Sequence, residues 1–300
     1  MRSLSTLTSS FNNTAWFGWS IALLNVLFFS IAAPLMTIIL KTGVDPTTLV
    51  TLRYILTTLL LGGTLVVTAP ERLRIDRKGL LTCALAGLLF GTSFFLFALS
   101  LTRISTSIAT MIAATAPLMV LLILATRGEP LTLRNITRLI LGLVGVYFLI
   151  GVTGQVDLLG VGLILMTALT YAFYVVIIQA LKDYDSQTVL IYIFGATMLF
   201  AMGLWAFQGG TSLQLSGRAW IAMGALVILA TYVAQLCLFI AIRHIGGGQM
   251  ALLNPVEVFL TVFWAILFLG DRLTPEQWLG GGLILASMVL AIKRIGRKAF

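Results

Sequence analysis

The sequence predicts an all-α integral membrane protein with ten transmembrane helices in two inverted five-helix repeats. The first observation is composition, because 59% of the 300 residues are hydrophobic and only 10% are charged, against about 25% charged in soluble domains. The second is that apolar runs of about 20 residues, long enough to cross a bilayer, recur from end to end. The third is a weak internal repeat at an offset near 140 residues.

Ten apolar segments account for the chain, and short connections rich in Gly, Pro and Asp separate them. No connection is long and polar enough to form a soluble domain, so the net charge of +9 needs no nucleic acid to explain it. The fifth segment is short. The predicted helices span residues 15–40, 49–68, 79–101, 107–124, 137–151, 158–181, 189–207, 220–242, 247–269 and 276–292.

Residues 1–14 are predicted to form a cytoplasmic N-terminal tail, 15–152 the first repeat, 153–292 the second repeat, and 293–300 a basic cytoplasmic tail. The first apolar run is too long for the core of a signal peptide, so we expect no cleavage. With the amino terminus inside, the cytoplasmic segments hold 14 of the 19 Lys and Arg residues. The positive-inside rule then places both termini in the cytoplasm and the protein in the inner (plasma) membrane.

The internal repeat consists of matches that occur in the same order along the chain. VDPTTLV at 44–50 resembles YDSQTVL at 184–190, and Arg103 and Arg243 are also 140 positions apart. Five helices cross a membrane an odd number of times, so the second half must enter from the opposite side. Inverted repeats of this kind are typical of secondary transporters, whose binding site lies near the bilayer midplane between the repeats.

Each half also carries a proline in its fourth helix, followed by a turn of the form acidic-x-Leu-Thr. These are Pro117 with Glu129-Pro-Leu-Thr, and Pro255 with Asp271-Arg-Leu-Thr. The arrangement resembles the drug/metabolite transporter superfamily of the EamA type, and the Asp-Pro turn that leads to Arg53 fits its second helix. The resemblance implies a ten-helix exporter of the amino-acid exporter kind. Members mostly export amino acids and other metabolites, exchange nucleotide sugars or phosphate esters, or expel drugs.

Glu257 is the one acidic side chain deep in a predicted span, where the resemblance implies an apolar or small residue. A carboxylate near the midplane costs about 3 kcal/mol, so its helix face should look into a cavity. Burial disfavours the charged form, which makes Glu257 a candidate for proton coupling. A charged Glu257 could instead pair with a substrate amine, or merely tie its helix to a neighbour. Its predicted face is Met250, Asn254, Glu257, Thr261 and Trp264.

Other polar side chains deep in the spans are candidates for substrate binding. Ser and Thr hydroxyls can donate a hydrogen bond to a carbonyl of their own helix, whereas side-chain amides and phenols cannot do so as easily. Arg53, near the start of the second span, is expected to extend its guanidinium outward to the interface. The predicted substrate-binding residues are Asn25, Thr92, Tyr171, Tyr174, Gln235, Asn254, Glu257 and Trp264.

Three prolines inside spans, Pro34, Pro117 and Pro255, are predicted helix kinks. Each removes one helical hydrogen bond and frees the carbonyl four residues earlier. A freed carbonyl inside a cavity can accept a hydrogen bond from an ammonium group. The alternative is a kink that only shapes packing or supports gating.

Several function classes are excluded. There is no Gly-x-x-x-x-Gly-Lys phosphate loop, so the sequence encodes no ATP-driven pump. No His, Cys and carboxylate cluster has metal-ligand spacing and no nucleophile-and-base pattern appears, so we expect no metal, cofactor or catalytic residue. Cys83 and Cys237 are predicted to be buried free thiols. The expected partners are a small-molecule substrate and the lipid bilayer. Small-residue steps such as Gly87-x-x-x-Gly91 allow close packing within the subunit or in a homodimer.

These observations predict a secondary transporter that works by alternating access through a midplane cavity. The resemblance implies that it exports small metabolites, with amino acids, above all aromatic or other hydrophobic ones, as the expected cargo. The alternatives are proton-coupled efflux of cationic drugs, with Glu257 exchanging proton for cargo, and a membrane enzyme or scaffold that transports nothing.

Overall fold

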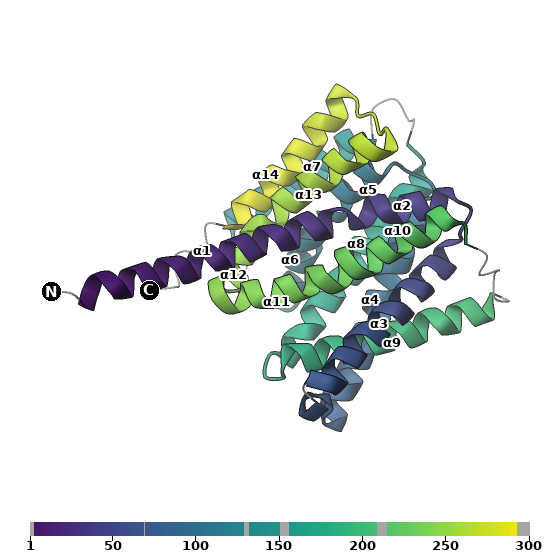
Figure 1. Cartoon of the computed structure of the whole chain (residues 1–300). Helices are drawn as coiled ribbons and strands as arrows, with labels where there is room; N and C mark the ends of the chain where they lie inside the picture. Colours follow the sequence, from purple (N-terminus) through teal and green to yellow (C-terminus); the bar gives the residue numbers. More distant parts are fainter. Residues whose placement is uncertain (1–2, 69, 129–131, 151–155, 209–214, 293–300) are drawn as a thin grey trace.

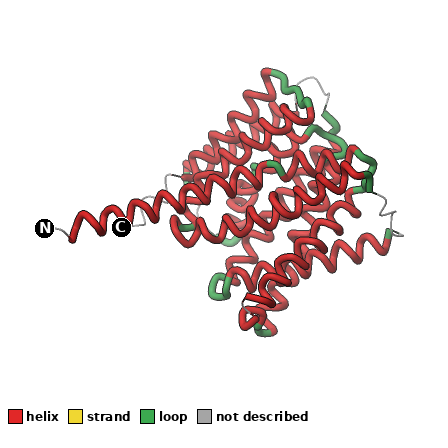
Figure 2. Tube along the Cα trace, viewed as in Figure 1, coloured by secondary structure: helices red, strands yellow, loops and turns green. Residues whose placement is uncertain are grey.

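The computed structural model describes residues 3–68, 70–128, 132–150, 156–208 and 215–292, and in these residues it contains helices joined by turns and loops, with no strand. Figure 1 and Figure 2 show the helices side by side in one bundle. Eight helical segments are long and apolar enough to span a bilayer, and Asn254–Leu269 is a shorter apolar segment. With the last helix, α14, these make ten crossings, so the predicted fold class is confirmed.

The first half contains five crossings, of which the first and the fourth are interrupted. A short 3-10 turn, η1 (Pro70–Leu73), lies between the second and the third. The helices are α1 (Ser3–Ser30) with α2 (Ala32–Lys41), α3 (Pro46–Thr68), α4 (Arg77–Ser100), α5 (Thr106–Ala113) with α6 (Ala116–Thr126), and α7 (Leu133–Ile150).

The second half contains the other five crossings, of which the third and the fourth change helix type within the span. They are α8 (Leu158–Ile178) with the 3-10 turn η2 (Gln179–Leu181), α9 (Ser186–Phe207), α10 (Gly217–Val227) with the π-helix η3 (Ile228–Val233) and α11 (Ala234–Ile245), α12 (Gly247–Met250) with the 3-10 turn η4 (Ala251–Leu253), α13 (Asn254–Trp264) and the π-helix η5 (Ala265–Leu269), and α14 (Pro275–Ile292).

Acidic and hydroxyl side chains mark where several helices begin. They accept hydrogen bonds from backbone N–H groups that have no partner within the helix. Asp157 accepts from the N–H of Leu159 at the start of α8. Helices α4, α5, α9 and α10 begin in the same way at Asp76, Ser105, Asp185 and Ser216.

The breaks between α1 and α2, between α5 and α6, and before α13 each lie within four residues before a proline, at Pro34, Pro117 and Pro255. Proline has no N–H, and its ring clashes with the carbonyl four residues earlier, so a helix cannot run through it unchanged. The span predicted over 247–269, with its kink at Pro255, divides into α12, η4, α13 and η5. Helix α1 starts at Ser3, within the segment that the sequence assigns to the tail.

Equivalent helices of the two halves pack in equivalent ways. Helix α1 packs along α11, and α4 packs along α8. Helix α1 belongs to the first crossing and α8 to the sixth, so they are equivalent; α4 of the third crossing and α11 of the eighth are equivalent in the same way. The contact of α4 with α8 is therefore the contact of α1 with α11 after the two halves are exchanged. Helix α7 packs on α14, its own equivalent, as Figure 1 also shows, and α3 packs on α9 in the same manner. This exchange symmetry is the one expected of inverted repeats.

Small residues allow two of these helix pairs to approach closely within the subunit. A Cβ atom on Gly280 of α14 would lie 2.6 Å from the carbonyl oxygen of Gly145 on α7. A Cβ atom on Gly87 of α4 would lie 2.6 Å from the carbonyl oxygen of Ile193 on α9. Real Cβ atoms do not come so close to backbone, so these glycines are needed for packing inside one chain. A homodimer stays a prediction.

Candidate functional site

Asn254 and Glu257 on α13 point away from the surrounding lipid. Val256, Phe259 and Phe263 are 40%, 54% and 46% exposed, and they mark the outer face of this helix. At about 100° per residue, Asn254 lies roughly 140–200° around the helix from all three. Asn254 is nevertheless exposed and Glu257 is half-buried. Exposure on the inward face means that the interior of the bundle is open to water beside these two residues.

Tyr171 on α8 faces the same interior. Its outer face is marked by Met166 and Phe173, and Tyr171 lies about 140–160° around the helix from each. The side chain is still 37% exposed. Tyr171 and Glu257, two of the residues predicted from the sequence, thus both face the interior although they are 86 positions apart. The Glu257 carboxylate makes no ion pair or hydrogen bond with the residues that the structure describes.

A wall of aromatic rings extends from Tyr171 across the interior. The ring centroid of Tyr171 lies 5.4 Å from the ring centroid of Tyr174. The ring centroid of Tyr174 in turn lies 4.8 Å from that of Phe90 on α4. Phe90 in turn contacts Phe94 on its own helix, with centroids 4.7 Å apart, and Tyr54 on α3 at 6.0 Å. Helices of both repeats contribute these rings, which are tilted relative to one another by 43° to 73°.

Arg53 lies inside the protein, so the prediction that it extends to the interface is wrong. The side chain is 2% exposed. Its Nε lies 3.3 Å from Oγ1 of Thr231, one terminal nitrogen lies 3.4 Å from Sδ of Met36, and its central carbon lies 4.8 Å from the centroid of the Phe94 ring. Contacts from α2, η3 and α4 cover this face of α3. A signal was present in the sequence, because threonines surround Arg53 at positions 47, 48, 51 and 57 and all are buried.

Three predicted binding residues use their polar groups within the protein. The Asn25 amide donates to the carbonyl oxygen of Ala234 at 2.8 Å, joining α1 to α11. The Trp264 indole donates to the Ser30 hydroxyl at 3.0 Å, beside the break between α1 and α2. The Thr92 hydroxyl donates to the carbonyl of Leu88 on its own helix at 2.8 Å. The first two brace helices against each other at the interrupted crossings.

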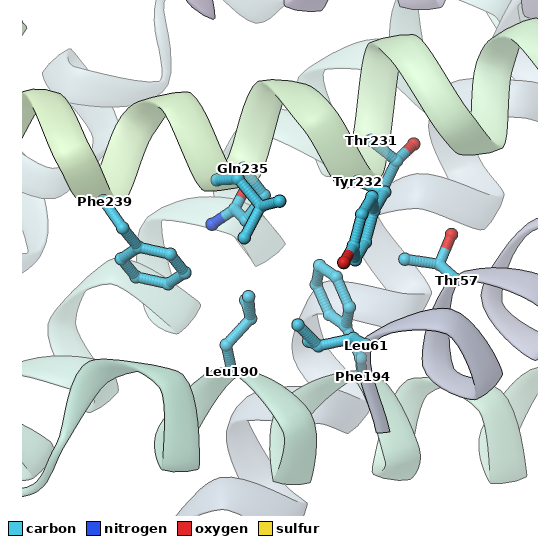
Figure 3. Close-up of a pocket in the computed structure, with 9 residues that line it drawn as sticks. Thr57, Leu61, Leu190, Phe194, Thr231, Tyr232, Gln235 and Phe239 are labelled. Atoms are coloured by element: carbon cyan, nitrogen blue, oxygen red, sulfur yellow. The ribbon is translucent and has the colours of Figure 1, made fainter. Parts of the chain in front are cut away.

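Gln235 lies where two clefts meet. The larger has a volume of about 240 Å³ and runs from Tyr174 and Gln235 to Lys182 and Tyr184 in the connection before α9. The smaller, of about 10 Å³, has room for roughly one water molecule. Figure 3 shows Leu190 and Phe194 of α9 facing residues of η3 and α11 across the smaller cleft. It is lined by Thr57, Leu61, Leu190, Phe194, Thr231, Tyr232, Gln235, Leu236 and Phe239.

The two ends of the bundle are held differently. We call the end with the connections α2–α3, α4–α5, α7–α8, α9–α10 and η5–α14 the Asp271 end, and the opposite end the Tyr184 end. Gly270, with a left-handed φ of 72°, ends η5 and turns the chain toward α5. Asp271 then accepts hydrogen bonds from the N–H and the hydroxyl of Ser107, at 2.9 and 2.8 Å. These bonds join one half to the other.

Two further contacts join the halves at the Asp271 end. The Thr47 hydroxyl donates to the Gln208 side-chain oxygen at 2.7 Å. Arg103 forms an ion pair with Asp157 at 3.2 Å and holds the pKa of that carboxyl below its ordinary value by donating a hydrogen bond to it. Polar contacts between the repeats therefore join the Asp271 end. A hydrogen bond from Tyr184 to Asp76 also joins the repeats at the Tyr184 end, where the larger cleft opens.

No group of three or more His, Cys, Asp or Glu residues that could hold a metal ion occurs in the described part of the chain. Cys83 and Cys237 are free and buried, as the sequence predicts. The acidic residue of the first acidic-x-Leu-Thr turn, Glu129, lies outside the described residues. The site is thus an aromatic, water-accessible interior with one carboxylate and a buried guanidinium behind its wall.

Comparison with known proteins gives two kinds of similarity. The sequence model of the EamA-like transporter family matches twice, over residues 16–151 and 158–293. The threonine/homoserine exporter RhtA of Escherichia coli (strain K12) is 29% identical over 235 residues, which cover 75% of this chain and 76% of that protein. The exporter of the same name from Salmonella typhimurium (strain LT2) is 28% identical over 242 residues, or 77% and 80% of the two chains.

Among solved structures, one titled "Crystal structure of protein" has the same fold. Its TM-score is 0.66 at 18% sequence identity, and the match covers 94% of this chain and 99% of that chain.

Proposed function

Because both of its halves match one family model, this chain belongs to the EamA-like transporter family, and we propose that it exports amino acids with aromatic or other hydrophobic side chains by alternating access. The coarser part of this statement, a membrane transporter of small metabolites, follows from the family and from the relatives named as amino-acid exporters. The identity of the transported amino acids, the alternating-access mechanism and the orientation of the protein in the membrane are what we propose.

The unpaired Glu257 carboxylate on the inward face of α13 is the observation that carries the proposal. A carboxylate near the middle of the membrane is costly unless it has a partner or water. The ammonium group of an amino acid supplies a partner of opposite charge. The exposed amide of Asn254, one helical turn away on the same face, supplies an acceptor for a second ammonium hydrogen.

The aromatic wall of Tyr171, Tyr174 and Phe90 supports cargo with a hydrophobic side chain. Ring faces and edges contribute roughly 0.5–1.5 kcal/mol per aromatic pair beyond the area that they bury. A short hydroxylated side chain, such as that of threonine or homoserine, would leave much of this surface uncovered. The named cargo of the relatives therefore supports the amino-acid backbone chemistry, while the wall supports the apolar side chain.

The larger cleft opens toward the Tyr184 end, and this position supports alternating access. Contacts between repeats join the Asp271 end, and the larger cleft reaches Tyr174 and Gln235 from the Tyr184 end. The positive-inside rule assigns the Tyr184 end, with Lys182, to the cytoplasm. A cytoplasm-facing cleft is the state in which an exporter loads. Rocking of one repeat against the other would then open the Asp271 end.

Transport assays in proteoliposomes test the proposal. We expect counterflow of phenylalanine and leucine to exceed that of threonine and homoserine. Glu257→Gln should reduce phenylalanine flux at least about tenfold, because the charge that pairs with the ammonium is lost. The matched control is Glu276→Gln, at an exposed position on α14. Equal flux for Glu257→Gln and wild type would remove Glu257 from the mechanism, and absence of flux for every amino acid would refute the function.

Orientation is tested in cells by thiol labelling. A cysteine at Lys182 should react only with reagents that reach the cytoplasm, and a cysteine at Arg218 should react with impermeant reagents outside. Both positions are exposed and belong to opposite ends. Labelling at the reversed sides would invert the proposed topology.

Proton-coupled efflux of cationic drugs is the second candidate, because the same unpaired carboxyl can exchange a proton for a cation. An imposed pH gradient separates the two. Drug transport that depends on the gradient in wild type but not in Glu257→Gln would favour this candidate over amino-acid export.

A further inference from the structure

We propose that Arg53 binds the carboxylate of the transported amino acid, so that the site holds a zwitterion between Arg53 and Glu257. This inference rests on the proposed function and names the second half of its binding site. It assigns the buried guanidinium on α3 a direct role toward substrate.

The contacts of Arg53 leave its charge without a counter-ion. It has a hydroxyl, a thioether sulfur and an aromatic face as neighbours, and none of these is anionic. No carboxylate lies within ion-pair distance of it in the part of the chain that the structure describes. A guanidinium has five N–H donors in a planar fork that matches the two oxygens of a carboxylate. Two of its nitrogens have protein partners, so the fork retains unused donors.

The π-helix η3 orients Arg53. The Thr231 hydroxyl donates to the carbonyl oxygen of Leu226, five residues earlier, at 2.8 Å. Its oxygen then faces Arg53 as an acceptor for Nε. Short π-helical segments often occur at functional sites. In this π-helical turn the Thr231 hydroxyl oxygen accepts the hydrogen bond from Nε of Arg53. A hydroxyl carries no charge, so it orients the guanidinium without neutralising it.

A second polar group near Arg53 also has no partner. Thr57 lies four residues further along α3 and therefore on the same helix face. Its hydroxyl is buried without a hydrogen bond, and Thr57 is 1% exposed. Thr57 and Thr231 both line the smaller cleft (Figure 3). A buried hydroxyl without a partner is uncommon and points to a ligand or a rearranged state that satisfies it.

Arg53 and Glu257 are two unpaired charges of opposite sign, which suits a zwitterion. The guanidinium carbon of Arg53 lies 4.8 Å from the centroid of the Phe94 ring, and Phe94 belongs to the aromatic wall that continues to Tyr171. Arg53 and Glu257 form no ion pair with each other in the part of the chain that the structure describes. An amino acid between them would pair both charges at once, which is favourable where water is scarce. The smaller cleft, which Thr57 and Thr231 line beside Arg53, holds about 10 Å³, so it must widen before a carboxylate can bind there.

The test compares two ligands that differ only in the group that Arg53 would bind. Phenylalanine and phenylalaninamide share the ring and the ammonium, but the amide has no carboxylate. We expect purified wild-type protein to bind phenylalanine about tenfold or more tightly than the amide. Arg53→Gln should lower phenylalanine affinity to that of the amide and leave amide affinity unchanged. Arg53→Lys should recover part of the discrimination, because it keeps the charge without the planar fork.

Control variants keep each outcome decisive. Arg218→Gln makes the same change at an exposed position and should bind both ligands as wild type does. If Arg53→Gln does not yield a folded protein, Thr231→Val keeps the charge, removes the acceptor for Nε, and should weaken phenylalanine binding more than amide binding. An equal loss for both ligands, or no loss, would overturn the assignment. Equal wild-type affinity for both ligands, with Glu257-dependent flux, would overturn it while leaving the proposed function intact; binding of no amino acid would refute the function itself.

Discussion

The hydroxyl of Tyr184 donates a 2.6 Å hydrogen bond to Oδ1 of Asp76. Tyr184 lies in the connection between η2 and α9, and Asp76 caps the start of α4, so the bond joins the two repeats at the Tyr184 end. Tyr184 also lines the larger cleft. It is therefore a polar tie across the mouth through which cargo would load.

Removing this tie should favour opening of the Tyr184 end. Tyr184→Phe keeps the ring and deletes the hydroxyl, so we expect a faster approach of substrate from that side, seen as an increase of about two- to threefold in initial uptake into inside-out vesicles. An exposed hydrogen bond contributes on the order of 0.5–1.5 kcal/mol, which sets this modest range. Tyr147→Phe, at an exposed position on α7, is the control. A lower rate in Tyr184→Phe would show that the hydroxyl assists loading.

The same bond predicts a pH dependence of stability. Hydrogen bonding from Tyr184 lowers the pKa of Asp76 below its ordinary value near 3.8. A carboxyl with a lowered pKa in the folded state stabilises the fold above its ordinary pKa, and the contribution is lost as pH falls through the lowered value. As the pH falls below about 5, the melting temperature of wild type should fall more steeply than that of Tyr184→Phe. Parallel curves would mean that the bond does not form in solution.

Asp271→Ala should weaken closure of the Asp271 end. The change removes both hydrogen bonds to Ser107 and leaves the first turn of α5 with an unpaired N–H. We expect a loss of about 1–3 kcal/mol in stability, measured as a lower melting temperature. Asp183→Ala removes an exposed carboxylate from the other end and should melt like wild type. Identical melting of the two variants would contradict a structural role for the Asp271–Ser107 contact.

Substitution by alanine should affect the stability of the protein differently at Gly280 and at Gly282, both on α14. A Cβ at Gly280 would lie 2.6 Å from the Gly145 carbonyl oxygen and 2.9 Å from the Leu149 nitrogen, and backbone atoms have little room to move. Gly280→Ala should cost about 1–3 kcal/mol of stability through overpacking. A Cβ at Gly282 meets nothing within 4 Å, so Gly282→Ala should be neutral or slightly stabilising. Thermal unfolding of both variants in the same detergent decides the matter.

The fold was predictable because its signals are local. Length and apolarity of each run identify a membrane span, and an odd number of spans per repeat forces inversion. The proline breaks were predictable at Pro34, Pro117 and Pro255 for the same reason, since the missing N–H acts on its own helix. The helix type at η3 and η5 was not, because π-helical turns depend on packing with neighbours.

The site was predictable only in part. Glu257 and Tyr171 could be selected because each is polar deep in an apolar span, and in the structure both face the interior of the bundle. Asn25 and Trp264 have the same sequence signature, yet each donates its hydrogen to a neighbouring helix. Arg53 was predicted to leave the interior and lies inside it. All five residues have a polar side chain in an apolar span, and this is all that the sequence shows of them. These two properties do not distinguish a residue that binds substrate from one that links two helices.

By itself the sequence determined that this chain is a ten-helix membrane protein of two repeats with an acidic group at depth. Only the tertiary structure decided which way each helix is rotated, and therefore that Asn254 looks inward and that Arg53 is covered by Thr231, Met36 and Phe94. The physical reason is that lipid and protein interior are both apolar. In water, the contrast between solvent and core orients a helix from its sequence pattern alone. In a membrane that contrast is missing, so helix–helix packing sets the rotation and with it the site.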